Sequence, residues 1–358
     1  MKRIWTRAAA AAALCALLLS GCSFSAQSQS ESTLPADPLT GQQLQYPGER
    51  AAAVVIENDP DSRVQWGIGS ASVVLEALTE TDRPTSLCLV YPAVSAMPTV
   101  GPVTRGQDLY WKLLTGQQVI PVQRGCGTFA RNYLDYYNIR AVDALEVGRN
   151  VFSCGDGWSS APLWRTSGQQ VQSVLSSLNI SPQLEQSASS AESDGTAAPT
   201  ALPALLPQKA DPHLPAPAAQ DAVQAQLHFG SQSTTAFAYN AADGTYGMLH
   251  ADGSAQQDAN TTAQAQFDNL LVLFSGSGLR DDEKTLDYDL SLGGGVWLNG
   301  GRLWHITWTQ GTDTTLALYD ADGRPLTLSA GHSYVALVSS VTGEELAVQD
   351  SAGAQLLF

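Results

Sequence analysis

The sequence has few basic residues. Its 358 residues include 18 Lys and Arg against 34 Asp and Glu, which gives a formal net charge of −16 at pH 7. A chain this acidic is repelled by phosphate backbones, so its composition argues against nucleic acid as a partner. It argues equally against adsorption to anionic lipids, so attachment to a membrane would need another device.

Histidine is scarce as well, and no histidine precedes His213 among the five in the chain. No two cysteines have the C-x2-C spacing that is typical of zinc sites. The P-loop, G-x-G-x-x-G, H-E-x-x-H and G-x-S-x-G patterns are missing too. The sequence therefore predicts no metal, no cofactor and no assignable catalytic residue.

What the chain does have is a secretory N-terminus. Lys2, Arg3 and Arg7 precede an apolar stretch over residues 8–19, which is shorter than the ~20 residues of a membrane-spanning helix. The stretch ends in Leu19-Ser20-Gly21-Cys22, the bacterial lipobox pattern. It predicts a signal peptide over 1–21 and a lipid on Cys22 that holds the protein at the extracytoplasmic face of the bacterial cell membrane. The alternative is an ordinary signal peptide with a chance cysteine.

Composition divides the rest of the chain. Residues 22–48 are polar and predict a disordered tether, and the Ser/Ala/Pro-rich segment 181–222 predicts a linker. Residues 49–180 alternate apolar runs with helical patterns, which predicts an α/β domain with a mixed or mostly parallel sheet. Residues 223–358 predict a mostly β domain. The expected fold class is α+β overall.

Local patterns predict individual elements. Apolar residues at helical spacing predict a helix over 70–80, and Leu87–Tyr91 predicts a strand. Ser167 begins a capping box for a helix. Asn299-Gly300-Gly301 predicts a hairpin turn. Trp304 and Trp308 fall on one strand face, which favours a core over a sugar-binding surface.

Several short motifs together resemble the YerB-like lipoprotein family, a pair of N- and C-terminal domains of unknown function. The matching segments are Pro38–Gly41, Val54–Asn58, Glu76, Gly101-Pro102-Val103, Tyr239–Tyr246, Trp308 and Tyr319–Gly323. The resemblance implies a two-domain lipoprotein and covers most of the chain outside the signal and the linkers.

Two loops depart from the family pattern. Thr104-Arg105-Gly106-Gln107 stands where Arg-Ser-Ala-Arg is usual, and Gln123-Arg124-Gly125-Cys126-Gly127 stands where His-Ala-Gly-Gly-Ser is common. If the family pocket holds an anion with two arginines and a histidine, this chain offers Arg105 and Arg124 alone.

These loops define a candidate ligand site where the two domains meet. A loop between a strand and a helix N-terminus is where α/β folds place ligands, and its backbone N–H groups suit a small anion. The expected ligand is a cell-wall component, a small anion or another envelope protein. The candidate residues are Asn58, Glu76, Gly101, Arg105, Gln123, Arg124, Gly125, Cys126 and Gly127.

An enzyme remains the alternative: a cell-envelope hydrolase or transferase that uses acidic residues or Cys126. Glu76 and Glu80 would share one helix face and are candidates for a carboxylate pair. Cys88, Cys126 and Cys154 allow one disulfide at most, for which Cys126–Cys154 is the weak preference. The acidic run around Asp281–Glu283 matches no calcium loop and predicts a solvated turn.

Overall fold

The computed structural model describes residues 35–59, 64–155, 163–184, 202–212, 214–215, 220–311, 315–339 and 342–358. The predicted signal peptide, Cys22 and the tether up to residue 34 lie outside these ranges, as does much of the predicted linker. Among the helices of the described residues, none is long and apolar enough to cross a membrane. Below, residues 35–184 are the first half of the chain and residues 202–358 the second half.

Three strands of the first half are apolar on both faces. β1 (Ala52–Glu57), β2 (Val73–Ala77) and β3 (Ser86–Tyr91) are buried almost throughout. A strand covered on both faces carries a continuous apolar run rather than an alternation. β3 lies between β1 and β2 and is antiparallel to both, while β1 pairs in parallel with β5 (Ile120–Gln123).

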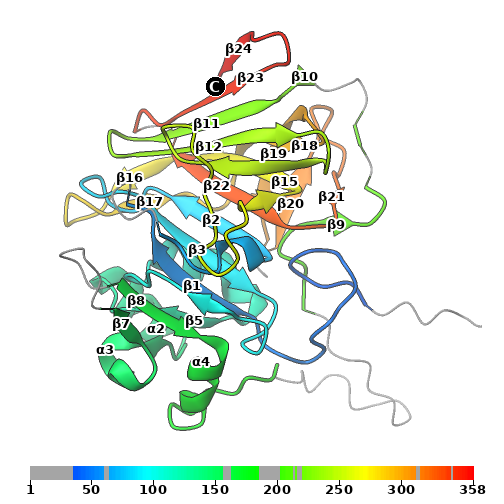
Figure 1. The fold of residues 1–358 in the computed structure, drawn as a ribbon. Coiled ribbons are helices and arrows are strands. Elements are labelled where there is room, and N and C mark those ends of the chain that lie inside the picture. The colour runs from blue at the N-terminus through cyan, green and yellow to red at the C-terminus, as the bar shows by residue number, and fades with distance from the viewer. Residues whose placement is uncertain are drawn as a thin grey trace, which may run out of the picture. The chain divides into compact units, whose positions relative to one another are not determined.

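The second half extends the same sheet. β22 (Ser333–Ser339) is parallel both to β2 and to β15 (Asn269–Ser275), and so joins the two halves. Figure 1 shows the resulting sheet, whose order is β10-β19-β18-β15-β22-β2-β3-β1-β5-β6, with β20 paired to β19. The remaining strands are β6 (Val142–Asp143), β10 (Gln220–Asp221), β18 (Leu292–Asn299), β19 (Arg302–Gln310) and β20 (Leu316–Tyr319).

The helix predicted over residues 70–80 is wrong, because Val73–Ala77 forms strand β2. A short apolar run fits a buried strand and a buried helix equally well by periodicity. Two adjacent β-branched residues, Val73 and Val74, favour the strand, and β2 lies between β3 and β22 with both faces covered. The strand predicted at Leu87–Tyr91 is confirmed as β3.

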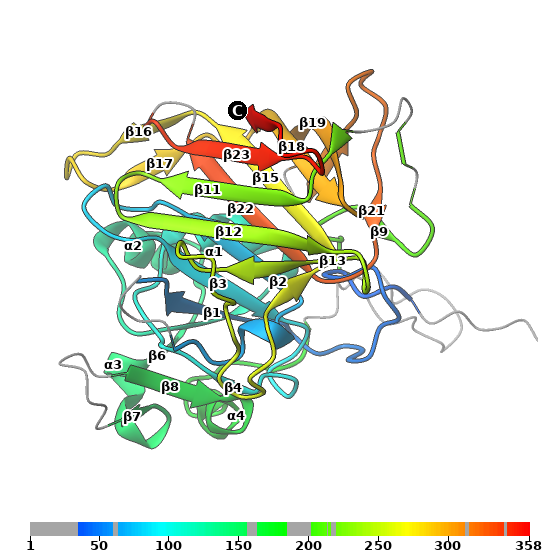
Figure 2. The ribbon, with the colours of Figure 1, turned by 45° about the horizontal axis from the view of Figure 1, so that its top comes forward.

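A second, antiparallel sheet lies across the large one, as Figure 2 shows. Phe237 and Phe267 of this sheet pack against Tyr334 of β22, with ring centroids 4.7 and 5.8 Å away. Its strands, in spatial order, are β14 (Gln266–Phe267), β13 (Thr245–Leu249), β12 (Ser233–Asn240), β11 (Gln224–Phe229), β23 (Glu345–Gln349) and β24 (Gln355–Leu357).

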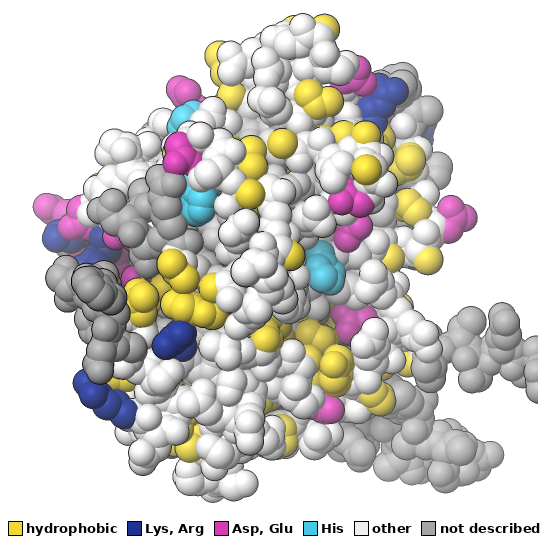
Figure 3. Space-filling view, viewed as in Figure 1, with side chains coloured by type: hydrophobic (Ala, Val, Ile, Leu, Met, Phe, Trp, Pro, Cys, Tyr) yellow, Lys and Arg dark blue, Asp and Glu magenta, His cyan; other side chains and the backbone are white. Residues whose placement is uncertain are grey.

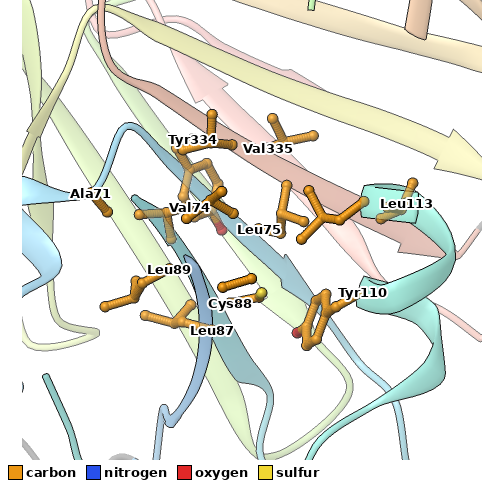
Figure 4. Close-up of a cluster of buried hydrophobic side chains, with 14 of the residues drawn as sticks. Ala71, Val74, Leu75, Leu87, Cys88, Leu89, Tyr110, Leu113, Tyr334 and Val335 are labelled. Carbon is orange, nitrogen blue, oxygen red and sulfur yellow. The ribbon is translucent and has the colours of Figure 1, made fainter. Parts of the chain in front are cut away.

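Helix α1 (Asp108–Leu114) covers part of the large sheet. Its Tyr110 and Leu113 lie beside Leu75 and Cys88 in the core (Figure 4). The other helices are α2 (Thr128–Tyr136), α3 (Ala144–Val147) and α4 (Gly168–Leu175), with 3-10 turns η1 (Ile68–Ser70), η2 (Thr115–Gln117) and η3 (Gly148–Asn150). The other strands form small sheets. β8 (Leu163–Ser167) lies between β4 (Thr99–Val100) and β7 (Ser153–Gly155) in one of them. In the others, β16 (Ser277–Leu279) pairs with β17 (Leu286–Tyr288), and β9 (Gln208–Lys209) pairs with β21 (Leu328–Ser329).

The α+β class is confirmed, with a mixed sheet and helices in the first half and mostly antiparallel strands in the second. Ser167 caps α4 by accepting from the Gln170 N–H, and the Asn299–Gly301 turn joins β18 to β19. Trp308 is buried, whereas Trp304 is half-buried and stacks on Trp297 at 4.7 Å.

The two halves share one core. The described residues of both halves belong to one compact unit, and their buried apolar side chains form one cluster. The physical reason is β22, an apolar strand that completes its hydrogen bonds with β2. Part of the predicted linker also packs inward, since Leu205 and Leu206 are buried.

Candidate functional site

Glu76 of β2 is the centre of a buried polar network, here called the Glu76 network. Its Oε1 accepts hydrogen bonds from Asn58 Nδ2 at 2.9 Å and from Thr85 Oγ1 at 2.6 Å. Its Oε2 accepts from the Tyr334 hydroxyl at 2.5 Å, and Thr235 Oγ1 lies 3.0 Å from both oxygens. Asn58 and Thr85 belong to the first half, and Thr235 and Tyr334 to the second.

The interior position of Glu76 limits what this network can do. The residue is 1% exposed, and burial raises the pKa of its carboxyl group although the surrounding hydrogen bonds oppose that rise. Each of these four partners is a neutral donor, which suits an acceptor-only carboxylate. The two predicted site residues Asn58 and Glu76 thus come together, but in the interior rather than at a ligand-accessible surface.

The predicted pairing of Glu76 with Glu80 on one helix face is also wrong. Glu80 lies beyond the end of β2 and binds two cations: its Oε2 is 3.0 Å from Arg83 Nε, and its Oε1 is 3.2 Å from Arg105 Nη1. The two carboxyl groups therefore lie in different environments, one dry and one ion-paired. They do not form the paired carboxylates that glycoside hydrolysis requires.

Three of the predicted residues line an open cavity of about 740 Å³, here called the charged cavity. Arg105, Cys126 and Gly127 form one wall, and the turn between β16 and β17, with Asp282 and Lys284, forms another. Both halves of the chain thus contribute to it. Figure 3 shows acidic and basic side chains gathered at the left margin of the molecule, where Figure 1 places β16 and β17.

Opposite charges are paired around this cavity. Besides the contacts of Glu80, Lys284 Nζ lies 3.0 Å from Asp82 Oδ2 across the two halves. Arg105 keeps 38% of its side chain exposed, so its guanidinium is accessible from the cavity while it contacts Glu80. An arginine in this position can bind a carboxylate or a phosphate through two parallel hydrogen bonds.

The N-terminus of α2 opens into the same cavity. Gly127 occupies the N-cap position and provides no side chain to cap the helix, and Thr128, Phe129 and Ala130 of the first turn line the cavity. The first N–H groups of a helix have no partner within the helix, and they carry its partial positive charge. Arg105 and this helix end therefore place hydrogen-bond donors on one wall, beside the Glu80 carboxylate.

Other predicted residues support the wall rather than line it. Gln123 Nε2 donates to Asp143 Oδ2 at 3.0 Å, and the Gly125 N–H donates to Asp143 Oδ1 at 2.8 Å. Gly125 has φ +67°, which favours glycine. A Cβ on Gly106 would lie 1.7 Å from Gln123 Oε1, so a side chain at residue 106 would displace the Gln123 amide.

Arg124 and Gly101 are not among the residues that line the charged cavity. The Arg124 guanidinium lies 5.5 Å from the ring centroid of Trp164. Gly101 precedes a cis proline and accepts a hydrogen bond from the Trp66 N–H at 2.7 Å. The two arginines expected to hold one anion are thus separated, and only Arg105 lines the cavity.

Cys126 is a free thiol. Burial raises its pKa above the ordinary 9.0, although the Gln123 amide and nearby arginines oppose the rise. The predicted Cys126–Cys154 disulfide is wrong, because both cysteines are free, as is the buried Cys88. At neutral pH the Cys126 side chain is therefore a protonated thiol and a poor nucleophile.

One group of charges that sequence reasoning missed lies next to the cavity. Arg280 Nη2 is 2.7 Å from Asp108 Oδ2 and 2.5 Å from Asp287 Oδ1, and its guanidinium stacks 4.4 Å from the Phe129 ring centroid. The sequence predicts a solvated turn around Asp281–Glu283, and these residues are exposed. Asp287, further along the chain, belongs to the Arg280 cluster. In the described part of the chain, no group of three or more His, Cys, Asp or Glu residues has an arrangement that fits a metal ion.

Comparison with known proteins identifies relatives over most of this chain. A model described as the N-terminal domain of a protein of unknown function (DUF3048) matches residues 39–190, and the corresponding C-terminal domain model matches residues 225–335. The chain is 24% identical over 308 residues to a Bacillus subtilis (strain 168) protein described as "Putative lipoprotein YerB", covering 84% of this chain and 85% of that protein.

The fold agrees with these matches. A crystal structure of the YerB protein from Bacillus subtilis superposes with a TM-score of 0.72 at 20% identity and covers 87% of this chain and 99% of the other. Two family models, a full-length relative and a shared fold support one assignment. The chain belongs to the YerB-like family, whose members carry the N- and C-terminal DUF3048 domains.

Proposed function

We propose that this protein is a lipid-anchored, extracytoplasmic lipoprotein of the bacterial cell envelope that binds a small ligand in the charged cavity without transforming it. The single observation that carries the binding role is a cavity of about 740 Å³ with Arg105 and an uncapped helix end on one wall. Cavities of this size are typical of small-molecule sites.

The anchor is argued from the lipobox pattern at Leu19–Cys22 and from a relative described as a lipoprotein. Because the chain carries a net charge of −16, anionic membrane surfaces repel it in the absence of a lipid. Replacing Cys22 with alanine (C22A) is expected to move the protein from the membrane fraction to the soluble secreted fraction. A C22A protein that stays with the membrane would contradict the anchor.

The expected ligand carries an anionic group and an ammonium group. Arg105 and the first N–H groups of α2 suit a carboxylate or a phosphate. The other wall carries Asp281 and Asp282, which suit a cation. A small zwitterionic molecule, such as a cell-wall peptide fragment, satisfies both walls.

The enzyme alternative is disfavoured by the chemistry of Cys126. A nucleophilic cysteine needs a lowered pKa or an adjacent base, whereas burial raises the pKa of this thiol. Asp143, a nearby carboxylate, raises that pKa further and is occupied by hydrogen bonds from Gln123 and Gly125. Binding without catalysis therefore fits the charged cavity better than a reaction that uses Cys126 as the nucleophile.

The proposal is tested by the thermal stability of the purified mature protein in the presence of muropeptides and zwitterionic dipeptides. A stabilising fragment is expected to bind about tenfold more weakly when Arg105 is replaced with glutamine, because a charged hydrogen bond is lost. Arg324→Gln is the matched control, since Arg324 is exposed and ion-paired with Asp322 in the second half. No stabilisation by any fragment, or an equal loss in both variants, would contradict the binding role.

A further inference from the structure

Three chain turns of the first half meet around a second cavity, of about 430 Å³, here called the tyrosine cavity. Gln118 follows η2, Asn138 follows α2 and Asn179 follows α4, and all three line the cavity. Each has a left-handed backbone, with φ of 48°, 51° and 55°. Three of the five non-glycine residues with positive φ in the described chain therefore surround this one cavity.

Two of these turns close helices with asparagine in the left-handed position. The Ile139 N–H donates to the Leu134 carbonyl at 2.8 Å, and the Ile180 N–H donates to the Leu175 carbonyl at 2.9 Å. Glycine is the residue that favours the left-handed position between such partners, because it has no Cβ. Asn138 and Asn179 occupy it instead, and each places a side-chain amide at the cavity.

These amides are available to a ligand. Within the described residues, no hydrogen bond is made by the side-chain amides of Gln118, Asn138 and Asn179. The backbone carbonyls nearby are already satisfied: Arg50 donates to the carbonyls of Gln118, Val119 and Ser181 at 2.7, 3.1 and 3.0 Å. The cavity thus offers neutral donors and acceptors rather than a free charge.

Tyrosines form an exposed rim. Tyr137 lines the cavity and is 52% exposed, and its neighbour Tyr136 is 82% exposed. The ring of Tyr137 lies 4.9 Å from that of Tyr136 and 4.7 Å from that of Tyr133. Aromatic faces carry a negative potential and attract the C–H groups of a sugar ring.

The charge of the lining separates this cavity from the charged cavity. None of its lining residues in the described chain is an aspartate or a glutamate, although the whole chain carries 34. Its two arginines have partners, because Arg50 binds carbonyls and Arg140 lies 3.9 Å from Glu146. The lining therefore suits a neutral, polyhydroxylated ligand.

We propose that the tyrosine cavity is a second binding site and that it takes a neutral glycan chain. One sugar ring stacks on Tyr137, and its hydroxyl groups hydrogen-bond with the amides of Asn138, Asn179 and Gln118. This site does not depend on the function proposed for the charged cavity, since no residue lines both.

The test is titration of the mature protein with chitotetraose, a neutral and soluble oligosaccharide, followed by calorimetry and by NMR of the side-chain amides. Binding is expected, with shifts of the Asn138 and Asn179 amide resonances. The double variant Asn138→Gly, Asn179→Gly keeps a backbone that glycine favours and removes both amides, and it is expected to bind about tenfold more weakly. Tyr137→Ala is expected to lose at least as much.

Thr262→Gly is the matched control, because Thr262 also has positive φ (62°) but lies in the second half, outside this cavity. It is expected to bind chitotetraose like the unchanged protein. The proposal is overturned if the unchanged protein does not bind the oligosaccharide at millimolar concentration. It is also overturned if the folded double-glycine variant binds with unchanged affinity.

Discussion

The Glu76 network and the charged cavity are both built where the two halves of the chain meet, yet each holds a carboxylate in a different environment, one buried and one open to solvent. Glu76 is buried and held by four neutral donors, two from each half. Glu80 is bound by two arginines at the edge of an open cavity. Burying an ion is tolerated where hydrogen bonds replace water, whereas an ion at a surface keeps its water and contributes little to stability.

The contrast arises over four residues of chain. β2 ends at Ala77, so Glu76 remains inside the sheet and faces Thr235 and Tyr334, whereas Glu80 lies on the chain that leaves it. Where the two halves of the chain meet, the structure is therefore closed to solvent at the centre of the sheet and open to solvent at its edge. Stability is expected to depend on the first region and ligand binding on the second.

Substitution of the two glutamates separates these roles most strongly. Glu76→Ala leaves the buried hydroxyl groups of Thr85, Thr235 and Tyr334 without their acceptor and is expected to lower the free energy of unfolding by about 4 kcal/mol. Glu80→Ala removes two partly exposed ion pairs and is expected to cost about 1 kcal/mol or less. Urea denaturation of both variants measures the difference. Equal losses would show that the closed and open regions are not distinct.

The elements that the sequence predicted well are those with local signals. The turn at Asn299–Gly301 and the cap at Ser167 depend on neighbouring residues, and both are present. The helix predicted over 70–80 was wrong because Val73–Ala77 pairs with β3, and its second partner, β22, lies more than 250 residues later. No local pattern encodes that pairing.

The candidate site was predicted only in part, because sequence reasoning groups residues of neighbouring loops but not residues that lie far apart in the chain. Arg105, Cys126 and Gly127 belong to neighbouring loops of one half and do line one cavity. Asn58 and Glu76 were grouped with them by resemblance, but Thr235 and Tyr334 of the other half hold Glu76 inside, and Asn58 donates to Glu76. The Arg280 cluster had no sequence signal, because its partners Asp108 and Asp287 lie far apart in the chain.

The pH dependence of stability sharpens the comparison. Because burial raises the pKa of Glu76 in the folded protein above the ordinary 4.5, the folded chain binds a proton where the unfolded chain is already ionised. Stability is therefore expected to fall as pH rises from about 4.5 through the folded pKa. Glu76→Gln, which cannot ionise, is expected to lack this contribution.

Denaturation of both proteins across this pH range measures the effect as a difference in slope. Burial also raises the pKa of Glu57, which titrates in both proteins and cancels in the comparison. Burial raises the pKa of Glu344 too, and the charge of Glu76 contributes to that rise, so the difference in slope includes this coupling. If Glu76→Gln keeps the full slope, Glu76 is not the source of the dependence.

The smallest expected effect concerns Cys126, the thiol in the charged cavity. In a chain that begins at residue 22 and carries C22A and Cys154→Ser, the remaining thiols are Cys126 and Cys88, which is buried and protected in the folded state. Because burial raises the pKa of Cys126, iodoacetamide is expected to alkylate it several-fold more slowly than free cysteine at pH 8. Cys126→Ser is expected to leave ligand binding in the cavity unchanged. Alkylation faster than that of free cysteine would mean that the loop activates the thiol, and the charged cavity would then be an active site rather than a binding site.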